Sequence, residues 1–493
     1  MGWGLVASVL LAAWWLRGAL PPYDDAFFFV RLARHTVTAG VPAWNLADGA
    51  VHGNTSQLQQ LWATLVWAVH PTHVVAWSRG LAVLALGVAC GLLRGREGAL
   101  LAVLGPVGLA TLTTGMETAL VIGLGAAFLF ELRHRGRAGW LVVWALLLYL
   151  GRPDTGLLTV GSLVVARRPR VTGALLVAVG GALVALWAVY GSPVPTSFLT
   201  KLVVGTDAYG PAFLQQSAEA KLRHGLFFGW CVVPLVASLS GRAGWLQAAP
   251  GVAFVGYHLA LTVDVMGMHG RFFAPALPWL VPSMYRALPW RLWAAWALAG
   301  AMLLAAGMLP GAEGGPINQV QPVTYLAFAV AVAVAGRGPW PAVPAVLLVG
   351  VLAWPAHRGV PTRSDAVHVA TYTAQVKSFH GLDDVAACLP AEVHVLHSEI
   401  GVPGMVLPQG RVTDLGGLMS PGWTHRTVDA RCEEARPDVV FLPHEHYRRL
   451  RRALVEGRCL QGYRQVVVGG SSPMWLRRDH LPTMRACTAR HGR

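Results

Sequence analysis

The sequence predicts a polytopic α-helical membrane protein with a C-terminal α/β domain outside the cytoplasm. Hydrophobic residues make up 54% of the 493 residues and charged residues only 13%, whereas a typical soluble protein carries about 25% charged residues. The apolar residues form long blocks without amphipathic spacing, as membrane-spanning helices do. After residue 356 these blocks end, and short strand-like and helix-like stretches alternate.

Apolar blocks fill residues 1–356, which we predict to be one transmembrane domain. Several blocks are shorter than the ~20 residues that a spanning helix needs, so we expect about 11–13 spans. The first block has an uncharged start and no small-residue cleavage site before Pro21-Pro22, which favours a retained helix over a signal peptide. The blocks run approximately over 3–20, 74–93, 99–113, 117–131, 139–150, 156–166, 171–190, 224–239, 246–263, 272–286, 291–309, 323–336 and 340–356.

Basic residues indicate the orientation. With the N-terminus in the cytoplasm, most basic residues before residue 357 fall in inner loops, as the positive-inside rule expects. The net charge of +15 therefore reflects topology signals and a basic tail, and we expect no nucleic-acid partner. The inner-loop residues are Arg94, Arg96, Arg133, Arg135, Arg137, Arg167, Arg168, Arg170, Arg242, Arg286, Arg291 and Arg337.

The tail, residues 357–493, lies outside if the number of spans is odd. Its alternating pattern predicts one α/β domain. The expected strands are Val393–His397, Val439–Leu442 and Gln465–Val468, and the expected helices are Asp429–Ala435 and Tyr447–Val455.

Four of the six cysteines lie in this tail: Cys388, Cys432, Cys459 and Cys487. In an exported domain they predict two disulfides, with three pairings open. A zinc site is disfavoured because the tail has no Cys-x-x-Cys pair.

Acidic residues gather on the outer side. Before residue 357 only Glu97 and Glu131 fall in inner loops. Asp24 and Asp25 open the first outer loop, residues 21–57. This pair could simply mark a water-exposed helix end. However, adjacent acids repel each other and the following Ala26–Val30 looks membrane-seated, which favours a functional pair. Such a pair could deprotonate a hydroxyl group, bind a divalent cation such as Mg²⁺ or Mn²⁺, or divide these roles.

Other outer loops add polar groups. Nucleotide sugars are not available as donors outside the cytoplasmic membrane. A glycosyltransferase there would therefore use a lipid-phosphate-linked sugar donor. Its site needs a carboxylate base, cations for the leaving phosphate and an apolar groove. The cations we assign to the phosphate are Arg271, Lys201 and Arg152. Residues that could orient these cations or bind acceptor or sugar are Arg31, Asn45, His52, Asn54, Glu117, Asp154, Asp264 and His269. For Glu117, Asp154 and Asp264 a structural ion pair is an equal alternative.

Several motifs resemble the GT-C superfamily of polyprenyl-phosphate-sugar-dependent glycosyltransferases. The resemblance is strongest to the group around the terminal arabinofuranosyltransferase and the proteins assigned to flagellar motor control. The motifs are Asp24-Asp-Ala-Phe27, Arg31-Leu-Ala-Arg-His35, Asn45-Leu-Ala-Asp48, Val51-His-Gly-Asn-Thr-Ser56, Thr114-Gly-Met-Glu-Thr118, Arg152-Pro-Asp154, Gly191 to Lys201, Asp264 to Pro278, Ser398-Glu-Ile-Gly401 and Val412 to Leu418.

The resemblance implies a bacterial cytoplasmic membrane protein with an acid of the first outer loop as catalytic base. It also implies a polyprenyl-phosphate-sugar donor, an envelope glycan or glycolipid acceptor, and an outer domain for glycan. His52 and Asn54 replace the family's Glu and Tyr, so we do not transfer arabinose as the sugar.

Two other functional classes use membrane proteins of this general kind: scaffolds or regulators, and transporters. A non-enzymatic scaffold or regulator of envelope or motor assembly could use the same fold. The altered loop 51–56 is compatible with such a function. A transporter would place polar residues near mid-membrane and repeat its halves; the polarity here is mostly at the outer face and no clear repeat is present.

Overall fold

A computed structural model of the chain describes residues 24–93, 115–202, 242–261, 274–280, 386, 388–420, 426–442, 448–467 and 474–490. Several predictions lie outside these residues. They are the apolar blocks 3–20, 99–113, 224–239, 291–309, 323–336 and 340–356, the domain boundary at residue 356, and the site residues Asp264, His269 and Arg271. Lys201 lies in a described helix, but its side chain is not described.

Six described helices coincide with predicted apolar blocks. They are apolar on all sides, as expected of helices surrounded by lipid or other helices. Two segments, Pro71–Ala89 and Pro169–Tyr190, are long and apolar enough to cross a membrane. The six helices are α4 (Val74–Leu92), α7 (Thr118–Phe130), α8 (Ala138–Gly151), α9 (Gly156–Val165), α10 (Pro169–Tyr190) and α13 (Arg242–Leu261).

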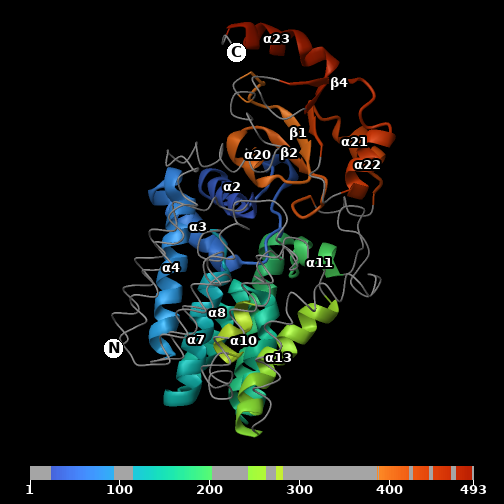
Figure 1. The fold of residues 1–493 in the computed structure, drawn as a ribbon. Coiled ribbons are helices and arrows are strands. Elements are labelled where there is room, and N and C mark those ends of the chain that lie inside the picture. Colours follow the sequence, from blue (N-terminus) through green and yellow to red (C-terminus); the bar gives the residue numbers. More distant parts are fainter. Residues whose placement is uncertain are drawn as a thin grey trace, which may run out of the picture.

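These helices form one bundle with its own apolar core. Small residues let the backbones approach closely. A Cβ built on Gly123 of α7 would lie 2.7 Å from the carbonyl oxygen of Ala85 in α4. On the same helix, Gly125 packs against Trp279, which follows the short helix η7 (Ala274–Ala276). Figure 1 shows the bundle extending away from the tail.

Two helices of the first described segment lie between the bundle and the tail (Figure 1). Helix α2 (Asp24–Ala39) begins with the acidic pair. The short helix η1 (Leu46–Asp48) leads toward α3 (Gln57–Val69), whose first turn is capped because Ser56 accepts a hydrogen bond from Gln59 N. The sequence analysis had not predicted α3. Helix η2 (Pro71–His73) then connects to the bundle, while α11 (Thr196–Leu202) follows α10.

The tail contains a five-stranded sheet in the order β2-β1-β3-β5-β4. Strands β1 (His394–His397), β2 (Arg411–Asp414) and β3 (Val439–Phe441) are parallel, and β4 (Tyr463–Val466) and β5 (Met474–Arg477) are antiparallel. The predicted strand at 465–468 is thus shifted by two residues, and β2 and β5 were missed. The helices are α20 (Gly401–Val406), α21 (Val428–Ala435), α22 (Arg448–Glu456), η11 (Arg478–His480) and α23 (Leu481–Arg490).

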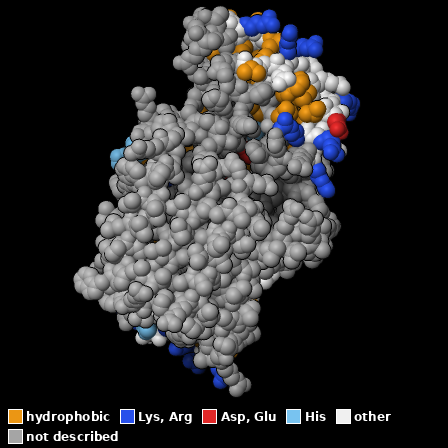
Figure 2. Space-filling view, viewed as in Figure 1, with side chains coloured by type: hydrophobic (Ala, Val, Ile, Leu, Met, Phe, Trp, Pro, Cys, Tyr) orange, Lys and Arg blue, Asp and Glu red, His pale blue; other side chains and the backbone are white. Residues whose placement is uncertain are grey.

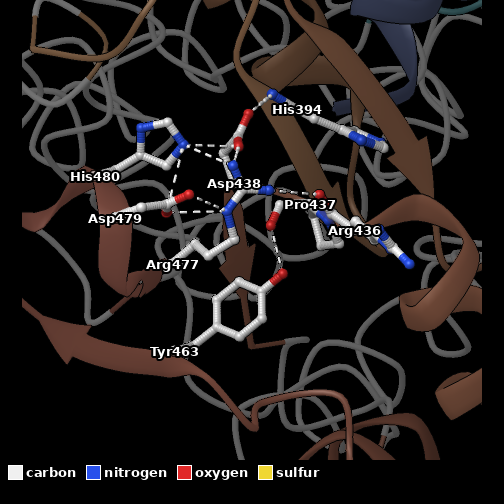
Figure 3. Close-up of polar contacts among 8 residues, drawn as sticks. All are labelled: His394, Arg436, Pro437, Asp438, Tyr463, Arg477, Asp479 and His480. Atoms are coloured by element: carbon white, nitrogen blue, oxygen red, sulfur yellow. Dashed lines mark hydrogen bonds and ion pairs between the residues drawn. The ribbon is translucent and has the colours of Figure 1, made fainter.

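One carboxylate joins the two parts of this sheet (Figure 3). Asp438, just before β3, accepts hydrogen bonds from His394 N at 2.8 Å and His480 Nε2 at 2.8 Å. It also pairs with Arg477 Nη2 at 2.9 Å. Tyr463 of β4 donates its hydroxyl to the carbonyl of Pro437. The antiparallel strands are thereby fixed to the parallel ones.

Two disulfides close the tail. Cys388 pairs with Cys487 of α23, and Cys432 of α21 pairs with Cys459. The outer edge of the tail is basic, as Figure 2 shows. The exposed arginines include Arg449, Arg452, Arg458, Arg464, Arg478 and Arg485, in agreement with the expected basic tail.

The aromatic run after the acidic pair corrects one expectation. Phe27, Phe29 and Val30 are buried in a core that they share with tail residues such as Val395 and Val402. They are therefore packed against protein side chains, which lipid need not cover. An apolar stretch beside two charges has the same pattern in both settings, so sequence alone could not distinguish them.

Candidate active site where the first outer loop meets the tail

Asp24 is the first residue of α2 and is only 2% exposed. Its Oδ2 accepts a hydrogen bond from Gly401 N at 2.9 Å, and its Oδ1 accepts one from Val402 N at 2.7 Å. Burial, opposed by these two bonds and reinforced by the charge of Asp25, raises the pKa of Asp24 to about 7. The carboxyl thus holds the start of α20.

Asp25 is partly exposed, in contrast to its neighbour. A third acid, Glu399, lies close by and is buried. Burial and the charges of Asp24 and Asp25 raise the pKa of Glu399 to about 8. Three carboxyl groups, two from the first loop and one from the tail, therefore share one electrostatic environment. Sequence analysis noted the Ser398–Gly401 motif but did not assign Glu399 to the site.

Arg31 lies about two turns after Asp24 on α2. It is buried and binds the tail. Its guanidinium donates to the carbonyl oxygens of Gly404 at 2.8 Å, Leu407 at 3.0 Å and Gly410 at 2.6 Å. It also donates to the Trp44 carbonyl at 2.6 Å and Asn45 Oδ1 at 3.2 Å. Burial lowers the pKa of Arg31 to about 9, so it stays charged at neutral pH.

Asn45 pairs with the backbone of β2 in the manner of a neighbouring strand. Its Oδ1 accepts from Val412 N at 2.9 Å, and its Nδ2 donates to Val412 O at 3.1 Å. Trp44 Nε1 donates to the same carbonyl at 2.8 Å. The structure therefore engages Arg31 and Asn45 in docking the tail. Their expected part in binding acceptor or sugar stays a prediction.

Asp414 shapes the turn that covers the first loop. It accepts hydrogen bonds from the backbone N–H groups of Gly416, Leu418 and Met419. Burial raises the pKa of Asp414 to about 6. The Met419 sulfur fills the space beside Gly53, where any side chain would overlap it.

The altered loop residue His52 contacts the C-terminal end of α10 and the residues that follow it. Its ring stacks on Tyr190 at 4.8 Å between centroids, and its Nδ1 lies 2.9 Å from Ser192 O. Because a carbonyl only accepts, Nδ1 carries the proton. Burial lowers the pKa of His52, which keeps the ring neutral. Asn54 bonds to Gln57 and Gln60 on α3.

Three buried polar atoms near the ends of α3, α7 and α10 have no hydrogen-bond partner within the described ranges: His52 Nε2, Ser197 Oγ and Glu117 Oε2. Buried polar atoms are nearly always paired. Sites that bind hydroxyl-rich ligands leave such atoms for the ligand. Ser197 was not singled out from the sequence, whereas His52 and Glu117 were.

Arg152 and Asp154 form a buried pair, with distances of 3.2 Å from Nε to Oδ1 and 2.5 Å from Nη2 to Oδ2. His258 of α13 adds a contact of 2.9 Å to Asp154 Oδ2. This triad ties the α8–α9 turn to α13. The contact is compatible with both sequence alternatives for Asp154, orientation of Arg152 and a structural ion pair, so its role stays a prediction. His258 lay inside an apolar block and gave no sequence signal.

Two crystal structures of ArnT from Cupriavidus metallidurans match the chain over nearly its whole length. The undecaprenyl-phosphate-bound structure covers 97% of this chain and 98% of ArnT, with a TM-score of 0.57 and 14% identity. The apo structure covers 98% of each chain, with a TM-score of 0.56 and 14% identity. The chain shares the fold of ArnT. No family model and no curated protein matches the sequence.

The described residues contain no group of three or more His, Cys, Asp or Glu side chains placed to hold a metal ion. Both oxygens of Asp24 already accept N–H groups. A divalent cation at the Asp24–Asp25 pair therefore stays a prediction. The same holds for Arg271, Asp264 and His269, which lie outside the described ranges.

Proposed function

We propose that the protein is a membrane glycosyltransferase that moves a sugar from a polyprenyl-phosphate donor to an envelope glycan or glycolipid. The observation that carries this proposal is the acidic pair, held at the junction of the first outer loop and the tail in a chain that shares the fold of ArnT. A solved structure with this fold contains undecaprenyl phosphate, which supports a polyprenyl lipid partner.

The proposed reaction needs a base for the acceptor hydroxyl and cations for the leaving phosphate. A carboxylate of the Asp24–Asp25 pair takes the proton of an acceptor hydroxyl, whose oxygen attacks the anomeric carbon of the sugar. The bond between that carbon and the phosphate oxygen breaks, and the electron pair leaves with the polyprenyl phosphate. Arg271 and Lys201, with Arg152 as a third candidate, are proposed to stabilise this phosphate. Mg²⁺ or Mn²⁺ held by the acidic pair would also stabilise the negative charge of the leaving phosphate.

The polar atoms of His52, Ser197 and Glu117 that have no protein partner are proposed to contact hydroxyl groups of sugar or acceptor. A neutral His52 offers Nε2 as an acceptor, which suits a hydroxyl donor. Because His52 and Asn54 differ from the residues of the resembling group, the sugar need not be arabinose.

The proposed location is the bacterial cytoplasmic membrane, with multiple spans, the N-terminus inside and the tail outside. Two disulfides in the tail support this orientation, because disulfides persist in oxidising compartments.

One observation favours a second candidate, a non-enzymatic scaffold or regulator of envelope or motor assembly. Asp24, Arg31 and Asn45 are engaged in holding the tail, and a scaffold also requires a fixed tail. Such a protein would need no reactive acid.

The test is transfer from a panel of radiolabelled polyprenyl-phosphate sugars into membrane glycans, with and without EDTA. Wild-type membranes should label glycan, and Asp25→Asn or Asp24→Asn should reduce labelling. Loss with EDTA and recovery with Mg²⁺ or Mn²⁺ would support a metal. No transfer from any donor, with both variants complementing a deletion strain, would refute the enzyme and favour the scaffold.

A further inference from the structure

We propose that the two adjacent acids have different tasks: Asp24 is a positioning residue that fastens the Glu399–Val402 segment of the tail, and Asp25 is the carboxylate that contacts substrate. The tail then forms one wall of the active site and is not a separate glycan-binding module. This inference rests on the proposed function and deepens it.

The geometry of Asp24 supports the positioning task. Each of its carboxylate oxygens accepts one backbone N–H, from Gly401 and Val402, and the side chain is almost completely buried. A general base must reach the proton that it removes, at about 2.6–3.2 Å. A carboxyl enclosed by the tail backbone meets this requirement poorly.

Asp25 lies one residue further along α2, where a helix has turned by about 100°. Its side chain therefore leaves the helix in another direction from that of Asp24, and it is partly exposed. The charges of both acids act on Glu399. Asp25 is thus close to the tail wall without being enclosed by it.

The tail wall is fixed at several independent points. Besides Asp24, the Arg31 guanidinium binds three carbonyl oxygens between Gly404 and Gly410. Trp44 and Asn45 bind Val412, and Met419 packs against Gly53. Every contact joins residues 24–53 to residues 401–419. A module that only captured glycan would not need its backbone locked to the catalytic loop in this way.

The backbones of Asp24 and Gly401 meet so closely that a Cβ at position 401 would overlap the Asp24 carbonyl oxygen. Gly401→Ala should therefore push the wall and Asp24 apart, although both carboxyl groups remain in the sequence. Gly139 is a matched control, because it is an exposed glycine of α8 with nothing within 4 Å of its Cβ position.

The experiment compares full-length wild type with Asp24→Asn, Asp25→Asn, Gly401→Ala and Gly139→Ala in nanodiscs. Three quantities are measured: hydrogen-exchange protection of residues 399–419, and kcat and KM for transfer from the donor that labels wild-type membranes. Asp25→Asn should lower kcat by about 100-fold or more with protection and KM unchanged. Asp24→Asn and Gly401→Ala should lose protection and raise KM, and Gly139→Ala should match wild type.

The opposite pattern overturns the proposal: Asp24→Asn that keeps full protection but loses kcat would make Asp24 the base. Loss of protection in Asp25→Asn would overturn it equally. If wild type transfers no sugar, the proposed glycosyltransferase function fails. The exchange data alone then decide whether Asp24, and not Asp25, fastens the tail.

Discussion

The carbonyl oxygen of Asp24 occupies the space in which a side chain at Gly401 would begin. These residues belong to helix α2 and to the tail, and they are joined again through the Asp24 carboxylate. Glycine at 401 is thus required by contact between two backbones, which cannot yield as a flexible side chain can.

Gly401→Ala should therefore destabilise the folded protein by about 1–3 kcal/mol, the usual effect of overpacking a tight contact. The measurement is thermal unfolding of the purified protein in detergent. Gly139→Ala should be neutral or stabilising by up to about 1 kcal/mol, because alanine is the better helix former. Equal melting temperatures for the two variants would contradict the close approach.

Arg31→Met should release the tail more than any other single change on α2. The substitution keeps an unbranched chain but leaves buried carbonyl oxygens of the tail unpaired, at about 1–3 kcal/mol each before relaxation. Proteolysis between residues 399 and 419 should become faster than in wild type. Arg31→Lys should rescue only part of this, since a lysine lacks the planar fork. Full rescue by lysine would show that charge alone matters.

Docking of the tail should weaken as the pH rises. The folded pKa values of Asp24, about 7, and Glu399, about 8, lie above their ordinary values of 3.8 and 4.5. The folded state therefore holds more protons, so stability falls between about pH 4 and pH 8. Asp25 and Asp414 also face Asp24 and belong to the same environment.

Melting temperatures at pH 5, 6, 7 and 8 measure this effect. Below about pH 6.5 the lowered pKa values of buried histidines, such as His394 at about 4, oppose the effect of the acids. The test is therefore the step from pH 7 to pH 8, over which wild type should melt at lower temperature. Glu399→Gln should flatten this decline and raise the melting temperature at pH 8, because it removes a buried acid with a raised pKa. A wild-type melting temperature that rises from pH 7 to pH 8, or a Glu399→Gln variant that declines as steeply as wild type, would contradict the assignment.

The two disulfides should contribute unequally. Cys388–Cys487 spans 99 residues and Cys432–Cys459 spans 27. The chain-entropy model gives about 4.7 and about 3.6 kcal/mol, respectively. Replacing each pair by serines and measuring unfolding tests the order. Labelling with a membrane-impermeant thiol reagent before and after reduction tests the outer location. Immediate labelling of all four cysteines in unreduced cells would contradict the disulfides.

Sequence reasoning recovered the parts of the fold that have strong patterns. Helices such as α7 and α10 were predicted because long apolar blocks leave few alternatives. Strand β1 and helix α21 were also found, whereas β2, β5 and α3 were not. Strand β2 begins with Arg411 and ends with Asp414. Charged residues at both ends are not typical of a buried strand.

The site was predicted less completely. The acidic pair was singled out because carboxylates are rare in this chain, and its catalytic role stays a prediction. The roles of Arg31 and Asn45 could not be found, since a polar side chain that binds a backbone carbonyl has the same sequence signature as one that binds a sugar. Their partners lie 367–379 residues away, and no local pattern records such a distance.

This separation affects how the protein is made. Asp24 and its partner Val402 lie 378 residues apart, and ribosomes add about 5–20 residues per second. Helix α2 leaves the ribosome about 20–75 s before the tail that covers its aromatic face. During biogenesis this face must be shielded by lipid or by a chaperone. Truncated chains that end before residue 400 should become substrates for membrane quality control.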